Sequence, residues 1–191
     1  MKLSPHFTLK EMTYSSTAVR LGLSNEPASA ELRALKALCF NVLEPIRNRF
    51  EVPFSPNSAY RSPAVNDAVH GSKNSQHLKG EAADIEIPGT SNFDLAVWIN
   101  ANLVFDQLIL EFFKDGEPDS GWVHVSFSQQ KNRKEVLRFD GHSYRHGLNI
   151  ETDTDLDDTN DSNFERARKR WSLNWLLDNL GILSHWRRRY D

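Results

Sequence analysis

The sequence has a single cysteine, no long apolar run and no large excess of one charge. Cys39 stands alone among 191 residues, which excludes an intramolecular disulfide and a cysteine-rich zinc site. No run reaches the roughly 18 apolar residues of a membrane-spanning helix, so we expect none. The formal net charge is −3, which gives no reason to expect a nucleic-acid partner. Any bound metal is therefore expected on histidine, aspartate or glutamate.

The N-terminus lacks a recognisable export signal, because no apolar segment of signal-peptide length follows Lys2. We therefore expect synthesis in the cytoplasm. Five Trp, eleven Phe and four Tyr argue against a wholly disordered chain. The length suits one domain with additions, and the prediction is a soluble, monomeric globular protein.

Apolar residues recur at spacings of three and four in three segments, which predicts helices over residues 28–50, 63–70 and 91–103. In the first helix, Ser29 is the expected N-cap and Pro45 is expected to kink or end it. The second opens at Pro63, because proline is tolerated in a first turn. Ser91 or Asn92 is the expected cap of the third.

Strand patterns lie between and after these helices, over residues 80–87, 105–113, 121–127 and 135–139. Residues 113–120 contain Gly and Pro and are typical of a hairpin loop. Helices followed mostly by hairpin-linked strands predict an α+β fold, with helices packed on a central antiparallel sheet.

The composition changes near Glu151, where six acidic residues and no basic ones occur within residues 151–163. We therefore predict a domain over residues 1–145, an acidic linker over 146–163 and a basic, aromatic, helical tail over 164–191. Two hypotheses remain open for the tail. Its helix packs on the domain, or its Trp and Arg side chains make a weak contact with an anionic envelope surface.

His77, Asp84 and His124 are candidate metal ligands. Two imidazoles and one carboxylate form a normal three-ligand shell for catalytic Zn²⁺, with a fourth position open. A loop that turns at Gly80 can bring His77 and Asp84 onto one cation, and His124 lies within an alternating strand. Taken singly, each residue is also explained as an ordinary strand, turn or loop residue.

Taken together, these residues form a known pattern. The signature S-x-H-x-x-G-x-A-x-D is matched at Ser75, His77, Gly80, Ala82 and Asp84. Arg61 precedes it, and Trp122-Val123-His124 follows as a second histidine motif. In these motifs the chain resembles the zinc D-alanyl-D-alanine carboxypeptidases, the D-Ala-D-Ala dipeptidases and the L-alanyl-D-glutamate endopeptidases of phage lysis. The resemblance covers about residues 3–138, and the opening residues resemble the start of single-domain members.

The resemblance implies a zinc peptidase acting on peptidoglycan stem peptides, with His77, Asp84 and His124 as the Zn²⁺ ligands. It leaves open a D-Ala-D-Ala carboxypeptidase or an L-Ala-D-Glu endopeptidase. In phage lysis, such an enzyme would act on the host cell wall in the periplasm.

The resemblance also implies roles for residues around the metal. Arg61 is expected to bind a substrate carboxylate or stabilise the oxyanion, because a guanidinium can bind both oxygens of a carboxylate. Ser75 is expected either to contact the substrate or to shape its loop. Gln76 and Trp122 are further predicted substrate contacts.

The general base departs from the family pattern, since Gly121 occupies the position where many members carry an acid. Strand alternation predicts a buried face made of Leu108, Leu110, Phe112, Val123, Val125 and Phe127. Glu111 then shares the other face with His124 and is our predicted base. Glu117 and Asp119 in the loop are its competitors.

Two further hypotheses compete with an active peptidase. The missing acid at Gly121 leaves room for a catalytically inactive module that binds zinc or cell-wall peptide. A regulatory α+β domain without metal is the third hypothesis, and it requires the motif order to be accidental.

Overall fold

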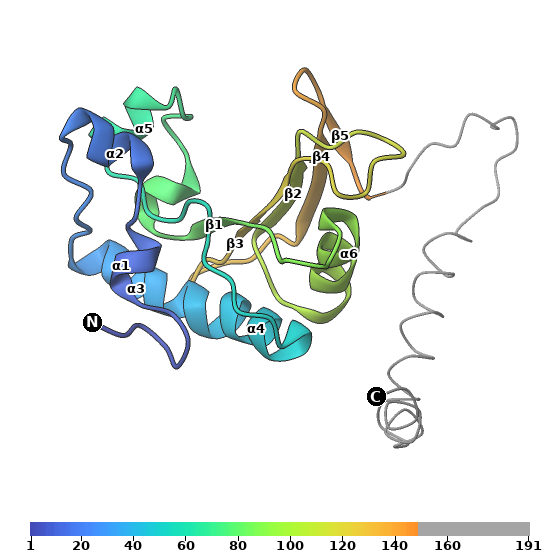
Figure 1. Ribbon diagram of the computed structural model, residues 1–191, viewed down its shortest axis with the longest axis horizontal. Coiled ribbons are helices and arrows are strands. Elements are labelled where there is room, and N and C mark those ends of the chain that lie inside the picture. The colour runs from blue at the N-terminus through green and yellow to red at the C-terminus, as the bar shows by residue number, and fades with distance from the viewer. Residues whose placement is uncertain (149–191) are drawn as a thin grey trace, which may run out of the picture. The chain divides into compact units, whose positions relative to one another are not determined.

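The computed structural model describes residues 1–148 (Figure 1). The predicted tail and nearly all of the predicted linker lie outside these residues. The predicted domain boundary at residue 145 falls within the last strand, and the first compact unit of the chain is Met1–Leu148. Among the described helices, none is long and apolar enough to cross a membrane.

A five-stranded sheet forms the centre of residues 1–148. Its strands are β1 (Ala82–Ile85), β2 (Gln107–Glu111), β3 (Trp122–Ser126), β4 (Glu135–Phe139) and β5 (Tyr144–His146). Their order in the sheet is β1-β3-β2-β4-β5, and β2 and β3 form the predicted hairpin.

The sheet is mixed, so the prediction of a wholly antiparallel sheet is wrong at one pair. β2 and β4 are parallel, whereas the other three pairs are antiparallel. β3 runs back along β2 and therefore ends beside the start of β2. Residues 127–134 then bring the chain to the free edge of β2, where β4 runs in the direction of β2.

Helices pack beside and below the sheet, and Figure 1 shows α3 and α4 running below it and α2 beside α5. Their bounds are α1 (Leu9–Met12), α2 (Ser16–Leu21), α3 (Ser29–Leu38), η1 (Cys39–Leu43), α4 (Glu44–Phe50), α5 (Pro63–Ala68), η2 (Gln76–Lys79) and α6 (Asn92–Asn102). α6 packs against β2 and β3.

The predicted first helix is continuous in space but changes its winding. The N-cap is Ala28, so the prediction of Ser29 is wrong, because the backbone is already helical at Ser29. The π-helix η1 ends at Leu43, two residues before Pro45, and its wider turn accommodates a ring that would clash with a carbonyl in a regular α-helix. The helix therefore continues past Pro45 to Phe50.

The starts of the other two predicted helices are confirmed. Pro63 occupies the first turn of α5, and the side chain of Ser62 caps it. Ser91 is the cap of α6, and its side chain accepts a hydrogen bond from the backbone N–H of Asp94. Each such cap stabilises its helix by about 1 kcal/mol.

One face of the β2–β3 hairpin is buried nearly as predicted. Leu108, Leu110, Val123 and Val125 have no exposed surface. Two of the six predicted residues differ: Phe127 is only half-buried, and Phe112 is 47% exposed with Phe113 buried in its place. The reason for the exposure of Phe112 is its positive φ of 53°, which interrupts the alternation after β2 ends at Glu111.

The opposite face of the sheet carries the polar residues. Asp84 pairs with His124 across β1 and β3, and Glu111 pairs with Trp122 across β2 and β3. Directly opposite residues share a face, and so do residues two apart in a strand. Asp84, His124, Glu111 and Trp122 therefore project on one side, and Glu111 shares the face of His124 as expected.

Candidate active site

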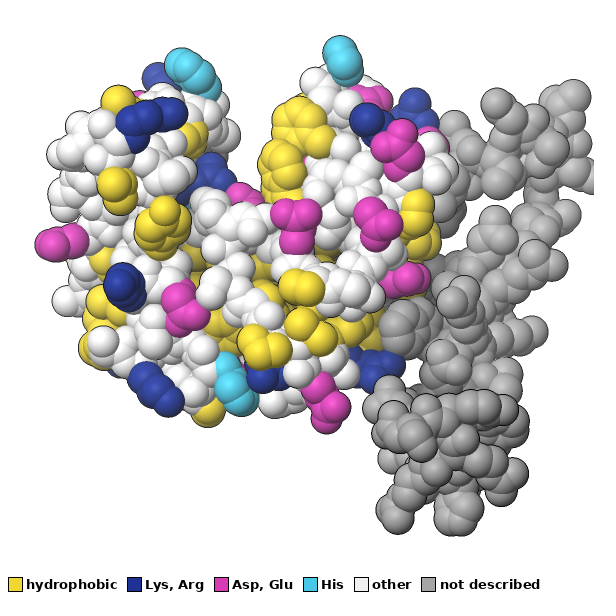
Figure 2. Space-filling view, in the orientation of Figure 1, with side chains coloured by type: hydrophobic (Ala, Val, Ile, Leu, Met, Phe, Trp, Pro, Cys, Tyr) yellow, Lys and Arg dark blue, Asp and Glu magenta, His cyan; other side chains and the backbone are white. Residues whose placement is uncertain are grey.

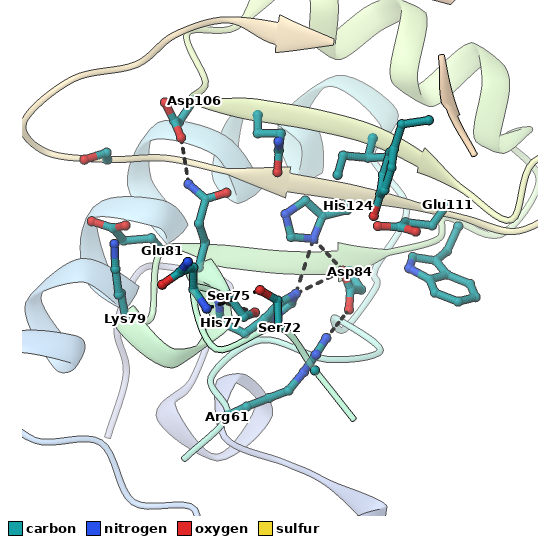
Figure 3. Close-up of a pocket in the computed structure, with 18 of the residues that line it drawn as sticks. Arg61, Ser72, Ser75, His77, Lys79, Glu81, Asp84, Asp106, Glu111 and His124 are labelled. Carbon is teal, nitrogen blue, oxygen red and sulfur yellow. Dashed lines mark hydrogen bonds and ion pairs between the residues drawn. The ribbon is translucent and has the colours of Figure 1, made fainter. Parts of the chain in front are cut away.

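His77, Asp84 and His124 converge in space although they come from η2, β1 and β3 (Figure 3). Asp84 Oδ1 lies 2.9 Å from His124 Nδ1 and 3.2 Å from His77 Nε2. The two ring nitrogens are 3.3 Å apart. All three side chains are buried, and one ligand atom from each lies within 4.8 Å of the others.

His77 is held in the orientation that a ligand needs. Its Nδ1 lies 2.6 Å from the carbonyl oxygen of Ala59, which can only accept a hydrogen bond. Nδ1 therefore carries the proton, and the lone pair of Nε2 points at Asp84 and His124. Burial lowers the pKa of His77, which favours the neutral imidazole that binds a metal.

Gly80 fixes the turn between His77 and Asp84. It ends η2 in the left-handed conformation, with φ of 69°. A Cβ here would lie 2.6 Å from the carbonyl oxygen of Glu31, so a larger residue would push η2 away from α3. The tight packing explains why the glycine of the motif sits between the two candidate ligands.

Asp84 is ionised and has a second partner. Burial alone would raise its pKa, but His77 and His124 outweigh burial and hold the pKa far below its usual value. Its other oxygen, Oδ2, accepts a hydrogen bond of 2.7 Å from Arg61, whose Nε donates to Ser58 Oγ. The structure thus places Arg61 behind the carboxylate of the trio.

The trio fits a divalent cation such as zinc on chemical grounds. It offers a neutral imidazole, an anionic carboxylate and a second imidazole, each buried and aimed at one point. Groups behind two of these residues hold them in place, as outer-shell partners do in metal sites. The residues present therefore satisfy the requirements of a three-ligand site.

Glu111 lies beside His124 in Figure 3 and lines the same cleft. Its carboxylate makes no hydrogen bond or ion pair with another residue within 1–148, so it is free to bind a water or a substrate proton. Burial raises the pKa of Glu111, an effect that Asp84 adds to and that His124 and Arg61 oppose. The competing Glu117 and Asp119 do not line this cleft.

Gly121 lacks an acid for a steric reason. Its φ is 66°, and a Cβ built at this position would overlap the carbonyl oxygen of Glu111. The hairpin can form in its present register only with glycine there. An acid in this cleft must come from another position, and Glu111 provides one directly beside the glycine.

The remaining predicted site residues have structural partners. Ser75 Oγ accepts a hydrogen bond from the backbone N–H of His77, which shapes the start of η2. Gln76 Nε2 donates to Asp106 Oδ2 at 2.7 Å. The ring of Trp122 packs on Phe112, with ring centroids 5.0 Å apart. Ser75, Gln76 and Trp122 all line the cleft, as do Asp106 and Phe112.

The cleft has a volume of about 740 Å³. Figure 2 shows a deep hollow between the part of the molecule that holds α2 and α5 and the part that holds β2, β4 and β5. Sequence reasoning missed several lining residues, namely Lys79, Glu81, Asp106, Phe112 and Tyr144. Lys79 and Glu81 flank Gly80 of the motif, and this position could have indicated that they lie at the site. No local sequence feature indicates that Asp106, Phe112 and Tyr144 line the cleft.

Comparison with known protein families identifies the family of the chain. The model of the family described as Peptidase M15 matches residues 5–126, well over half of the sequence. The chain belongs to the Peptidase M15 family. This match confirms the resemblance at the level of the M15 family and makes the protein a peptidase by family. A search of curated proteins finds no match to this M15 peptidase. The matched residues contain His77, Asp84, His124 and Glu111, but not β4 or β5.

Proposed function

We propose that this M15 peptidase is a zinc-dependent hydrolase of peptidoglycan stem peptides that acts in cell-wall degradation, as in phage lysis. The observation that carries the proposal is the convergence of His77 Nε2, Asp84 Oδ1 and His124 Nδ1 on the floor of the cleft. The cut bond is either D-Ala-D-Ala, at the end of the stem, or L-Ala-D-Glu, near its start.

In this proposal His77, Asp84 and His124 hold the zinc. A bound Zn²⁺ supplies a Lewis acid that polarises the scissile carbonyl and lowers the pKa of water. Arg61 orients Asp84 through the 2.7 Å hydrogen bond to Oδ2. Its guanidinium also lines the cleft, where it can meet a substrate carboxylate or the oxyanion.

Glu111 moves the proton. Its carboxylate takes a proton from the attacking water and returns it to the nitrogen of the leaving amine. A raised pKa suits this exchange, because a base works best when its pKa approaches the working pH. The position of Glu111 on the face of His124 supports an active enzyme over a binding module that lacks the acid.

Digestion of purified peptidoglycan tests the function, with mass analysis of the released muropeptides. Release of D-alanine identifies the carboxypeptidase, and a new N-terminal D-glutamate identifies the endopeptidase. Either product should vanish with excess chelator and return when zinc is added back. Intact muropeptides under zinc-replete conditions, together with retained binding to the wall, would instead favour the inactive binding module.

A further inference from the structure

We propose that an aromatic wall of the cleft binds a pyranose ring of the glycan strand that carries the stem peptide. The wall consists of Trp122, Phe112 and Tyr144, which line the cleft, together with Phe139, whose ring contacts those of Phe112 and Tyr144. The proposal rests on the proposed function, and it narrows the substrate to a peptide still attached to its sugar.

The four rings form a continuous series. The centroid distances are 5.0 Å from Trp122 to Phe112, 5.2 Å from Phe112 to Phe139 and 4.6 Å from Phe139 to Tyr144. The strands explain the alignment, because Glu111 lies opposite both Trp122 and Phe139, and Phe139 lies opposite Tyr144. The wall therefore crosses the sheet from β3 to the edge strand β5.

Phe112 is held in an unfavourable backbone conformation. It has a φ of 53° and is 47% exposed, where glycine or asparagine would fit more easily. A bulky residue rarely adopts this backbone conformation, and such strain concentrates at functional sites. Tyr144 is 57% exposed on the same wall. Figure 2 shows hydrophobic side chains on the sheet side of the hollow.

The wall extends well beyond the metal trio. Neighbouring strands lie about 4.8 Å apart, so β5 lies about 14 Å from β3, which carries His124. An extended peptide advances by about 3.3–3.6 Å per residue. A dipeptide bound at His124 would leave most of this wall uncovered. The cleft is therefore built for a longer ligand.

The chemistry of the wall selects the sugar. Stem peptides consist mainly of alanine, acidic and diamino residues, which offer methyl groups and charges but no broad apolar surface. The C–H face of a pyranose ring is flat and apolar, and it can stack on aromatic rings. His146 lies two residues after Tyr144 and therefore on the same face of β5. The imidazole of His146 and the hydroxyl of Tyr144 can both hydrogen-bond to the polar edge of the sugar.

The test compares one stem peptide in two forms, free and linked to the N-acetylglucosaminyl-N-acetylmuramic acid disaccharide. Phe112→Ala and Tyr144→Ala should each raise KM for the linked form roughly two- to tenfold, with kcat and the melting temperature nearly unchanged. KM for the free peptide should not change. Phe40→Ala removes a 56% exposed phenylalanine outside the cleft and should alter neither substrate.

An equal rise in KM for both forms would show that the wall binds the peptide and would refute the proposal that it binds the sugar. Unchanged KM for both forms would refute the proposal that the wall is a binding site. Binding of the disaccharide alone, followed by NMR, separates this proposal from the proposed function. Disaccharide binding that Tyr144→Ala weakens supports the wall even if neither peptide is cut. Hydrolysis of the peptide without binding of the disaccharide would support the proposed function and refute sugar binding by the wall.

Discussion

His77, Asp84 and His124, the proposed metal ligands, are held in place by contacts of the backbone. The turn at Gly80 and the carbonyl of Ala59 set His77, whereas strand pairing sets Asp84 directly opposite His124. Because these contacts involve the backbone, removal of one of the three side chains should leave the other two in place. The site should then lose metal without losing its fold.

We predict that His124→Ala reduces bound zinc from about one per chain to near zero, since two protein ligands rarely retain the ion. Elemental analysis of protein purified after zinc-replete expression measures this. His77→Ala should behave in the same way. His70 lines the same cleft but lies outside the trio, so His70→Ala should keep its zinc. Full activity in excess chelator would contradict the assignment.

Glu111→Gln should lose about 10²–10⁴-fold in turnover while it keeps its zinc and melting temperature, because glutamine has similar size but cannot accept the proton. Steady-state hydrolysis of a stem peptide measures the loss. Glu117→Gln, in the exposed loop, is the matched control and should stay within a few-fold of wild type. A collapse in Glu81→Gln with an active Glu111→Gln would assign the base to Glu81 instead.

At the residue scale, the sequence was informative where a motif or an alternation acts locally. It grouped His77, Asp84 and His124, and it placed Glu111 on the face of His124. It could not show that Gln76 is tied to Asp106, 30 positions later. Nor could it reveal that Gly121 must be glycine, because the contact with the Glu111 carbonyl exists only once the hairpin has closed.

At the element scale, Asp106 joins three segments at the start of β2. Its carboxylate accepts two side-chain hydrogen bonds from Arg133, of 2.9 and 2.8 Å, and a third from Gln76 of η2. The hydrogen bonds from Arg133 lower the pKa of Asp106 to about 2. The folded state therefore favours the ionised carboxylate, and this contribution to stability depends on pH.

We predict that Asp106→Asn lowers the free energy of unfolding by about 1–2 kcal/mol at neutral pH. Because the folded pKa lies below the unfolded value, the difference should be complete above about pH 4 and shrink as pH falls toward 2. Urea unfolding at several pH values measures it. Glu117→Gln should cost little at any pH, and a pH-independent deficit in Asp106→Asn would refute the electrostatic explanation.

The periodicity of apolar residues predicted most helices and strands but not how all the strands of the sheet pair. The helices at residues 63 and 91 begin as expected, and β2 and β3 pair as a hairpin. The parallel pairing of β2 with β4 was missed, because alternation within a strand carries no information about its neighbour's direction. β5 has three exposed residues and therefore no apolar pattern to detect.

At the scale of the whole molecule, His77, Asp84, His124 and Glu111 all lie within residues 1–148, the part of the chain that the structure describes. We therefore predict that deleting residues 151–191 leaves the rate on a soluble stem peptide unchanged. The same deletion separates the two hypotheses for the tail. Weaker binding to cell envelopes with an unchanged melting temperature supports the envelope contact, and a lower melting temperature supports packing on the domain. A large loss of rate on the soluble peptide would contradict the prediction.

The order of parts along the chain has a consequence for how such enzymes diversify. The trio and Glu111 are complete by residue 124, and the family match ends at residue 126. β4 and β5, which carry Phe139 and Tyr144, come afterwards. A single genetic crossover within residues 127–134 would therefore replace Phe139 and Tyr144 of the proposed aromatic wall and leave the proposed metal ligands and Glu111 untouched. Chimeras joined there offer a direct route to altered wall specificity by design.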